Sequence, residues 1–568
     1  MSSINLRVVL WMALGLALYL NYTAWQRDYG VQPTTAAHPN GASGVSAPSL
    51  GATVPSGVPH VAEPKAPAAA ATPAVERATV ATPATLKVRT DVLALEISLQ
   101  GGELRQADVL RYPKVKNRPE DVVRLLNRDS RDTMFVLQSG LAGPAGTDAP
   151  YPTHLATFSS PEETYTLAPG SAELRVPLVW SDGHGVQVTK TYVFHRGSYA
   201  IDVDYRVENA GDAPWSAAVY AQLLRHNEPV ERSMFSPDTY AFKGPAYYDG
   251  TKYQKLRIDN AEDRKLSREI TGGWLAALQH HFVAAIVPAA GVPYHYTLRS
   301  EDREYLLTAV GPQKIVPAHS SETFETQLFI GPKLQAQLKT AGPRLDLVAD
   351  YGRLTLLAEP LFWLLSKVHG LVGNWGWAIV IVTFLLKLVF YPLSEASGRS
   401  MAKMKALSPR IKNLQETHKD DREKLGRAMM DLYKREKINP AAGCLPMLVQ
   451  IPVFLAFYWV LLESVEMRQA PFMGWINDLS SRDPLFILPA IMAAAMFAQY
   501  KLNPAPPDPV QAKVFMIMPL AMSVMFAFFP AGLVLYWVTN TVLSIAQQWN
   551  INRRIETQRA ASGGARRP

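Results

Sequence analysis

The sequence predicts a polytopic α-helical membrane protein with six spans and a large extracytoplasmic all-β sandwich domain. Three observations predict this fold class. Residues 86–343 alternate apolar and polar side chains between turn residues, as the strands of a sandwich do. Basic residues are concentrated in two segments that the positive-inside rule places in the cytoplasm. The third observation is a set of six apolar runs, namely Val8–Leu20, Gly376–Tyr391, Leu445–Leu462, Pro484–Gln499, Val514–Phe529 and Ala531–Ala546.

The residue inventory argues against catalysis and against structural disulfides. Among 568 residues only Cys444 is a cysteine, so no internal disulfide can form, and its apolar neighbours favour a packing role. The local signatures of hydrolases, P-loop proteins, dinucleotide-binding enzymes and zinc proteases are absent from the sequence. His280 and His281 have no cysteine or acidic partner at ligand spacing. We therefore expect no catalytic residue, no metal and no cofactor.

Residues 1–30 are predicted to form an uncleaved signal anchor, which is the first span. Its apolar core follows Arg7, and bulky Tyr22, Trp25 and Tyr29 stand where a small-residue cleavage site would be needed. Residues 31–85 are rich in Ala, Pro, Thr, Gly and Ser. They cannot bury enough apolar surface to offset chain entropy, so they are predicted to be a disordered tether.

Residues 86–343 form the predicted sandwich, and residues 344–370 a predicted amphipathic helix on the outer membrane surface. The sandwich is long enough to bury a core without disulfides. Tyr247 and Tyr248 would line a ligand groove if exposed, but packing within a sheet is the favoured interpretation. In the helix, Pro360 is expected to bend or split the chain. Packing of this helix against the sandwich is the alternative to a surface position.

Span 2, residues 371–393, contains an ionisable group, Lys387. Such a group is costly in a span and usually faces a bundle interior or a water-filled cavity, so it marks a functional site. The alternative is snorkelling, because Lys387 lies about one helical turn, roughly 6 Å, from Tyr391 and from the headgroups beyond it.

Residues 394–440 are predicted to be a cytoplasmic helical hairpin, residues 441–549 to hold spans 3–6, and residues 550–568 to be a basic cytoplasmic tail. The tail is rich in Ala, Gly and Ser and is not expected to fold alone. The positive charge of these segments has two competing explanations. In the first, it keeps the segments soluble, sets their membrane topology or binds anionic lipid. In the second, it binds acidic or RNA-bearing partners. The candidate partner-binding residues are Arg399, Lys403, Lys405, Arg410, Lys412, Arg553, Arg554 and Arg559.

Polar residues recur inside the predicted spans and indicate a hydrated groove. Thr383 lies four residues before Lys387, on the same helical face. Gln450, Tyr458 and Asn540 fall in other spans. Any one of them could simply join helices, and it is their combination with a lysine that favours a groove. No relay of acidic residues accompanies them, which argues against a proton-coupled pump.

Five longer motifs occur in order in the helical part: Asn374–Ser394, Ser400–Glu416 (SMAKMKALSPRIKNLQE), Asn439–Leu461 (NPAAGCLPMLVQIPVFLAFYWVL), Val465–Phe472 (VEMRQAPF) and Phe529–Trp537 (FPAGLVLYW). They resemble the YidC/Oxa1/Alb3 family of membrane protein insertases, in the Gram-negative YidC form with an anchor, a periplasmic domain and a five-helix core. The resemblance covers residues 345–551 strongly and the sandwich more loosely. In this family a positive residue, usually arginine, stands at the position of Lys387. Lysine keeps the charge but loses the bidentate guanidinium.

The resemblance implies a non-enzymatic insertase and chaperone, with a groove open to the cytoplasm and to lipid. It places Thr383, Tyr458 and Trp459 on the substrate path, and it implies a periplasmic domain similar to a sugar-binding β-supersandwich. The implied partners are nascent membrane proteins, the ribosome, membrane lipid, the Sec translocon, and the signal recognition particle with its receptor. The chain would act as a monomer or within a larger complex. The implied location is the bacterial inner membrane, with both termini in the cytoplasm and the large domain in the periplasm.

Two other function classes compete with this hypothesis. A solute transporter or channel should show repeated halves or paired broken helices, and the sequence has no visible repeat. A scaffold of a secretion machine would not need polar residues within its spans. The positions of Lys387, Gln450 and Asn540 therefore favour the insertase.

Overall fold

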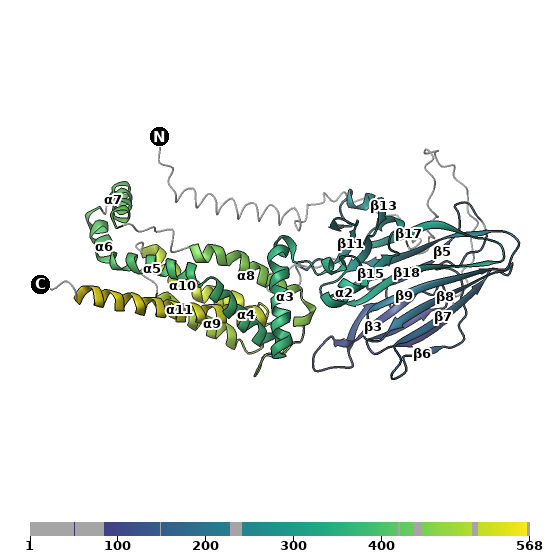
Figure 1. Cartoon of the computed structure of the whole chain (residues 1–568), viewed down its shortest axis with the longest axis horizontal. Helices are drawn as coiled ribbons and strands as arrows, with labels where there is room; N and C mark the ends of the chain where they lie inside the picture. The colour runs from purple at the N-terminus through teal and green to yellow at the C-terminus, as the bar shows by residue number, and fades with distance from the viewer. Residues whose placement is uncertain are drawn as a thin grey trace, which may run out of the picture. The chain divides into compact units, whose positions relative to one another are not determined.

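The computed structural model describes Leu50 and residues 84–147, 149–227, 241–418, 421–436, 445–502 and 509–564. The predicted anchor, residues 1–30, and nearly all of the predicted tether, residues 31–85, lie outside the described residues. Both therefore stay predictions. The described chain forms a β-sheet domain followed by a helical domain (Figure 1).

The β-rich domain that the alternating segments predict is confirmed, and its strands form two sheets. The ten-stranded sheet has the spatial order β13 (Ser267–Thr271), β16 (Pro293–Glu301), β17 (Glu304–Val316), β10 (Trp215–His226), β5 (Phe135–Ala142), β3 (Leu104–Pro113), β2 (Leu93–Ser98), β1 (Thr85–Arg89) and β6 (Thr164–Thr166), with β4 (Val122–Leu126) paired to β3. The eight-stranded sheet has the order β12 (Tyr253–Lys255), β11 (Gly244–Tyr248), β14 (Trp274–Leu278), β15 (Phe282–Pro288), β18 (Ser320–Pro332), β9 (Ala200–Asn209), β8 (Val186–His195) and β7 (Glu173–Ser181). One apolar core contains residues of both sheets, so the sheets pack against each other.

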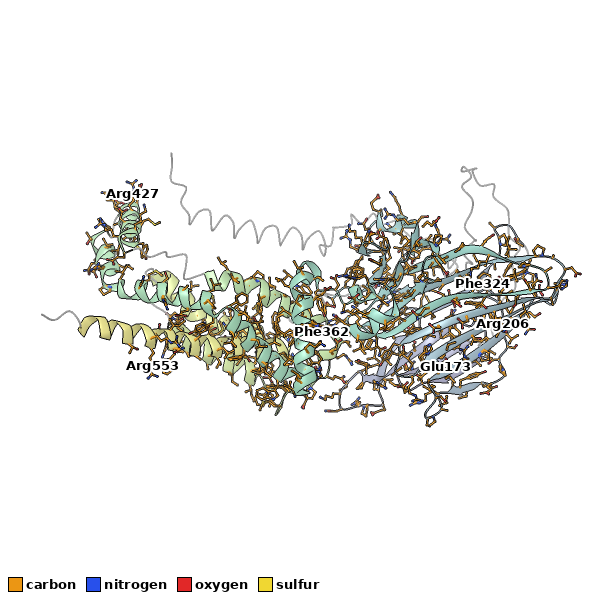
Figure 2. All side chains as sticks on the ribbon, in the orientation of Figure 1. Glu173, Arg206, Phe324, Phe362, Arg427 and Arg553 are labelled. Carbon is orange, nitrogen blue, oxygen red and sulfur yellow. The ribbon has the colours of Figure 1, made fainter. Side chains whose placement is uncertain are left out.

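Apolar and polar residues alternate along strands such as β9 because every second side chain faces this core. Along β9, Val203 and Tyr205 are fully buried, whereas Arg206 is exposed. Neighbouring β18 pairs Phe324 with Tyr205 and Thr323 with Arg206, so the apolar pair lies inside and the polar pair outside. Figure 2 labels one residue of each pair, Phe324 and Arg206. Buried apolar surface stabilises the fold by about 25 cal/mol per Å². The alternation in the sequence therefore reports the two faces of each sheet.

Tyr247 and Tyr248 lie in β11 and are both buried. Tyr248 stacks on Trp274 with ring centroids 6.0 Å apart. These tyrosines pack within the sheet domain and are not available to a ligand groove.

The helices form a second apolar core. The described helices are α2 (Gln335–Ala341), α3 (Thr355–Val372), α4 (Trp375–Val389), α5 (Tyr391–Ala406), α6 (Ser408–Thr417), α7 (Arg422–Arg435), α8 (Leu445–Glu463), α9 (Ile487–Leu502), α10 (Pro509–Phe526) and α11 (Ala531–Gly564), with 3₁₀ turns at Asp263–Lys265, Leu345–Val348, Gly352–Leu354 and Val465–Met467. The core includes Leu365 of α3, Ile379 of α4, Val460 of α8, Met492 of α9 and Val534 of α11. It therefore joins helices from both ends of the helical domain.

Taken one at a time, none of the helices in the described ranges has both the length and the hydropathy that a bilayer crossing requires. One pair meets the requirement jointly, Trp375–Val389 with Tyr391–Ser400, and it is bent by 61° at the break between them. The arrangement of six spans stays a prediction.

The segment 344–370 is divided before Pro360 rather than at it. Two 3₁₀ turns precede α3, and Gly352 has a φ of 64°, a left-handed conformation that interrupts a regular helix. Helix α3 then runs unbroken through Pro360. Its buried face, which includes Leu365, packs on α4 and α8, whereas Leu356 and Trp363 are exposed. The start of the segment does pack against the sandwich, because Leu345 and Val348 lie in its core, whereas α3 packs against the other helices.

The two basic segments also differ from the prediction. Helices α6 and α7 pack together through Leu407, Ile411 and Tyr433, as in the predicted hairpin, but a third helix, α5, precedes them. Helix α5 ends before α6 because Pro409, near the start of α6, has no N–H with which to continue the helix. The predicted tail is helical as far as Gly564, as part of α11. Extending an established helix costs far less than nucleating a new one, which explains why this polar segment follows the packed part of α11.

Polar contacts join the sheet domain to the end of α8. His280 Nε2 lies 2.9 Å from the carbonyl oxygen of Leu462. Lys333, directly after β18, pairs with Glu463 at 4.0 Å. Both side chains of this ion pair are less than 8% exposed. Removing one of them would leave a buried charge uncompensated.

Candidate functional site

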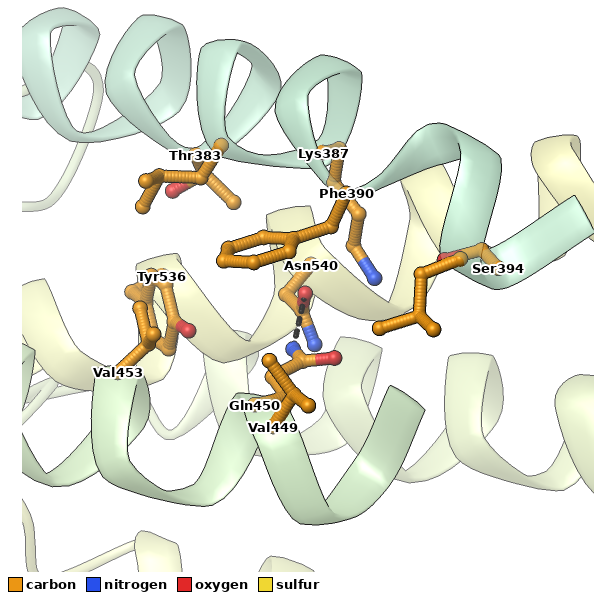
Figure 3. A pocket seen from close by; sticks show the side chains of 11 residues that line it. Thr383, Lys387, Phe390, Ser394, Val449, Gln450, Val453, Tyr536 and Asn540 are labelled. Atoms are coloured by element: carbon orange, nitrogen blue, oxygen red, sulfur yellow. Dashed lines mark hydrogen bonds between the residues drawn. The ribbon is translucent and has the colours of Figure 1, made fainter. Parts of the chain in front are cut away.

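The helices enclose a small pocket around Lys387 (Figure 3). Helix α4, the start of α5, α8 and α11 form its walls. Its volume is about 30 Å³, enough for about two water molecules. The lining residues are Thr383, Leu386, Lys387, Phe390, Leu393, Ser394, Val449, Gln450, Val453, Tyr536 and Asn540.

Helix α4 brings Thr383 and Lys387 to the pocket. The side chain of Asn374 fixes the start of the helix by accepting a hydrogen bond from the amide of Trp377 at 3.1 Å. Thr383 is almost fully buried, and its hydroxyl donates to the carbonyl of Ile379 at 2.6 Å. Thr383 therefore shapes the wall, while Lys387 supplies the positive charge.

Two hydrogen bonds cross from neighbouring helices to α11. Lys387 Nζ donates to Ser544 Oγ at 2.8 Å. Gln450 Nε2 of α8 donates to Asn540 Oδ1 at 2.5 Å, the contact drawn in Figure 3. The ammonium of Lys387 is thus held against α11. One hydrogen bond joins α4 to α11, and the other joins α8 to α11.

The pocket brings together four of the six residues predicted for the groove, Thr383, Lys387, Gln450 and Asn540. Tyr458 and Trp459 lie on α8 outside its lining. They follow Gln450 by eight and nine residues, which is about 12 Å or more along the helix axis. There the ring of Tyr458 lies 6.0 Å from that of Phe529, centroid to centroid.

The sequence reasoning missed Tyr536 in the lining and Ser544 as the partner of Lys387. A signal was present, because Tyr536, Asn540 and Ser544 are spaced by four and share one face of α11. Phe390 and Ser394 gave no such signal. They reach the pocket because the chain bends between α4 and α5.

The basic residues predicted to bind partners lie on α5, α6 and α11, and some already have partners. Arg399 pairs with Glu395 at 2.6 Å, and Arg410 pairs with Glu436 across α6 and α7 at 2.6 Å. The guanidinium of Arg553 lies over the ring of Trp549. The remaining candidates are Lys403 and Arg554, which are exposed, and Lys405, Lys412 and Arg559, whose side chains lie outside the described residues.

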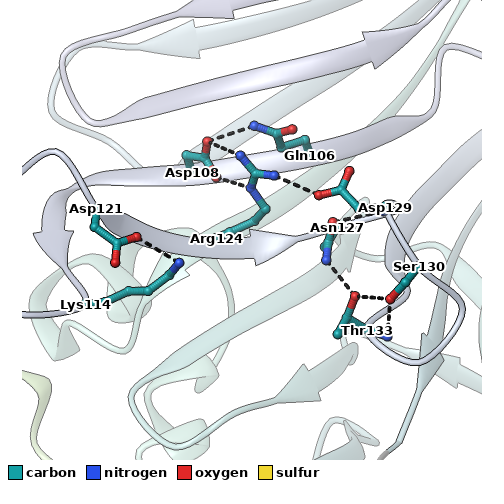
Figure 4. Close-up of polar contacts among 9 residues, drawn as sticks. All are labelled: Gln106, Asp108, Lys114, Asp121, Arg124, Asn127, Asp129, Ser130 and Thr133. Atoms are coloured by element: carbon teal, nitrogen blue, oxygen red, sulfur yellow. Dashed lines mark hydrogen bonds and ion pairs between the residues drawn. The ribbon is translucent and has the colours of Figure 1, made fainter.

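A larger polar cleft of about 900 Å³ lies in the sheet domain beside β3 and β4. Arg124 joins Asp108 at 2.8 Å and Asp129 at 3.0 Å, and Lys114 pairs with Asp121 at 2.9 Å (Figure 4). These two cations and three carboxylates are all paired. The cleft therefore offers mixed polarity without a dominant charge, and sequence reasoning did not predict it.

The groups around Lys387 can bind but do not form a catalytic set. They are one ammonium, two carboxamides and the hydroxyls of Thr383, Ser394 and Tyr536, of which that of Thr383 already donates to a main-chain carbonyl. In the ranges that the structure describes, no cluster of three or more His, Cys, Asp or Glu side chains could hold a metal. The arrangement suits a polar or anionic group that accepts hydrogen bonds from Lys387 and Gln450.

Comparison with known proteins identifies relatives for the whole chain. A family model described as the 60Kd inner membrane protein matches residues 367–558, and one described as the YidC periplasmic domain matches residues 85–364. The membrane protein insertase YidC of Nitrosococcus oceani is 46% identical over 560 residues, covering 98% of this chain and 99% of the relative. That of Thioalkalivibrio sulfidiphilus is 46% identical over 572 residues, covering 97% and 99%. A crystal structure of an active YidC insertase with its first transmembrane domain resolved has a TM-score of 0.38 at 20% identity, covering 82% of this chain and 92% of that one.

The sequence relatives confirm the family that the five motifs indicate. Their shared name describes membrane protein insertion rather than a catalysed reaction. Proteins of this family belong to the inner membrane and carry a periplasmic domain, which here is the sheet domain. The chain therefore belongs to the YidC family and is a membrane protein insertase.

Proposed function

We propose that the pocket around Lys387 is the closed form of a hydrophilic groove that receives the short polar tail of a nascent membrane protein. The observation that carries the proposal is the meeting of Lys387, Gln450 and Asn540 from three helices in one pocket. A polar tail in this groove meets water and hydrogen-bonding groups instead of hydrocarbon, which lowers the cost of its transfer. The client's apolar segment moves sideways into lipid, and burial at about 25 cal/mol per Å² drives insertion without a nucleotide.

Opening is a necessary step in this mechanism. A volume of about 30 Å³ holds water but not a peptide. For a client to enter, α11 must separate from α4 or from α8. The bonds that such a movement breaks are those of Lys387 with Ser544 and of Gln450 with Asn540.

We further propose that the helical domain crosses the membrane with both termini in the cytoplasm. Ile517, Leu520 and Val524 form an apolar stripe on α10, and each is more than half exposed. Leu388 and Val389 at the end of α4 are also more than half exposed. Such surfaces are unfavourable in water and suit contact with lipid. The predicted runs are shorter than about 20 residues, so a locally thinned bilayer fits this arrangement.

The proposed partners beyond nascent chains are the ribosome, the Sec translocon, and the signal recognition particle with its receptor. Exposed Lys403 and Arg554 are positive charges that anionic surfaces would meet on α5 and α11. Chaperone activity on the client follows from the same groove, because a segment held there is shielded from aggregation while its neighbours fold.

A crosslinking experiment tests the groove. A photoreactive side chain at Gln450 should crosslink to the polar tail of a ribosome-stalled client, whereas the same group at exposed Ile517 of α10 should react mainly with lipid. Both positions lie in helices of the same domain, so the comparison controls for expression and labelling. Equal tail crosslinking from both positions would contradict the proposed path.

A further inference from the structure

We infer that Ser544 is a positioning residue that holds the ammonium of Lys387 at the level of the pocket, where an acidic client tail meets it. The inference rests on the proposed function of the pocket and adds a residue to it. Lys387 Nζ and Ser544 Oγ are 2.8 Å apart and join α4 to α11.

Ser544 is arranged to accept from a cation. Its own hydroxyl donates to the carbonyl of Asn540, one turn earlier on α11, at 2.7 Å. A hydroxyl has one proton and two lone pairs, so this bond leaves only acceptor capacity for Lys387. An ammonium, which has donors and no acceptor, is the matching partner.

Several other polar groups near the pocket already have partners. Gln450 bonds to Asn540 at 2.5 Å, and the hydroxyl of Thr383 bonds within α4 at 2.6 Å. Glu395, on the first turns of α5, pairs with Arg399. Within the described residues, the side chain that accepts a hydrogen bond from the ammonium of Lys387 is therefore that of Ser544.

A lysine needs such an anchor more than an arginine does. Its four-carbon stem has many rotamers, and its charge is a compact point that one acceptor can hold. Without an acceptor, the stem can extend toward water past the end of α4 at Val389. Ser544 therefore keeps the charge in the pocket instead of at its cytoplasmic edge. One hydrogen bond shifts such an equilibrium by about 3- to 10-fold.

The test is a double-mutant cycle in the full-length chain, read as the insertion rate of two clients. One client has an acidic tail, and the other has the same tail with its acidic residues replaced by amides. Ser544→Ala should slow the acidic-tail client by about 3- to 10-fold and leave the neutral-tail client within about 2-fold. Ser544→Thr keeps the hydroxyl and should restore the wild-type rate. In a Lys387→Leu background, Ser544→Ala should have no further effect.

Ser523→Ala is the matched control for lost helix packing. The hydroxyl of Ser523 joins α10 to the carbonyl of Pro489 on α9 at 2.5 Å, away from the pocket. This variant should affect both clients equally. The inference is overturned if Ser544→Ala acts equally on both clients, if it still acts without Lys387, or if it has no effect while Lys387→Leu is impaired. Normal insertion of acidic tails by Lys387→Leu would instead refute the proposed function itself.

Discussion

The ammonium of Lys190 on β8 donates a hydrogen bond to the main-chain carbonyl of Gly102, 3.1 Å away in the turn between β2 and β3. It also donates to the carbonyls of Gly101 at 3.1 Å and Ser139 at 3.0 Å. Its three N–H groups therefore match three acceptors from the opposite sheet, and the ring of Tyr192 lies 5.0 Å from the nitrogen. Lys190 is fully buried and ties the two sheets together.

Replacing Lys190 by Met should destabilise the sheet domain by about 3–5 kcal/mol, because three buried carbonyls lose their donor at once. Hydrogen exchange of the β8 amides in the full chain measures this loss. Lys314→Met, at an exposed position of β17, is the matched control and should change protection by less than about 0.5 kcal/mol. Unchanged protection of β8 in Lys190→Met would show that the lysine contributes no net stability.

Glu466 makes the contact between the sheet domain and the loop after α8 sensitive to pH. Its Oε1 accepts from the amide of Gln335 at 3.4 Å, while Oε2 has no partner within the described residues. Burial raises the pKa of Glu466 to about 7 from a usual value of 4.5. Between these values the folded carboxyl keeps a proton that the unfolded one has lost. The contact therefore loses stability as pH rises through this window, and the loss is complete above about pH 7.

Glu466→Gln should remove this pH dependence. At pH 8 the variant should be more protected from exchange than the wild type at the amides of Gln335 and Met467, by about 3 kcal/mol at most, and at pH 5 the two should agree. The comparison is made after correction for intrinsic exchange. Burial also lowers the pKa of His281 nearby, but that contribution is common to both proteins and cancels. Equal pH profiles would mean that Glu466 is already ionised at neutral pH.

Lys387→Arg should retain insertion of acidic-tail clients, because charge is kept. Lys387→Leu should slow it by about 10-fold or more, since a nearby opposite charge contributes about 1–4 kcal/mol at partly hydrated sites. The insertion rate of a client without acidic residues serves as the control and should change little. Normal rates for Lys387→Leu with every client would favour snorkelling of this side chain.

The basic surfaces of α5 and of the end of α11 should bind ribosomes in a salt-dependent way. The detergent-solubilised protein should co-sediment with ribosomes at low salt, less after removal of residues 552–568, and least when Lys403 and Lys405 are also neutralised. Arg399 and Arg410 should matter less, because each is already paired with a glutamate. Arg206→Gln on the sheet domain is the control for loss of a positive charge away from these surfaces. Binding that withstands both salt and truncation would exclude an electrostatic contact.

Sequence reasoning succeeded where one local pattern decides burial. Alternation in β9 separates Tyr205 from Arg206, and the spacing of four places Thr383 and Lys387 on one face of α4. It failed for Ser544, because a serine in an apolar helix is ordinary and its contact with Lys387 depends on packing between segments 157 residues apart. The helical tail was missed for a related reason, since cooperative extension of α11 overrides the low propensity of its polar end.

Helix α11 holds its residues at fixed distances along one long axis. Its 34 residues extend for about 51 Å, whereas the hydrocarbon core of a bilayer is about 30 Å thick. Ser544 and Arg554 lie on this one rod, about 15 Å apart along its axis. A partner that binds at Arg554 is therefore held at a set distance from Ser544, and so from the contact that Ser544 makes with Lys387.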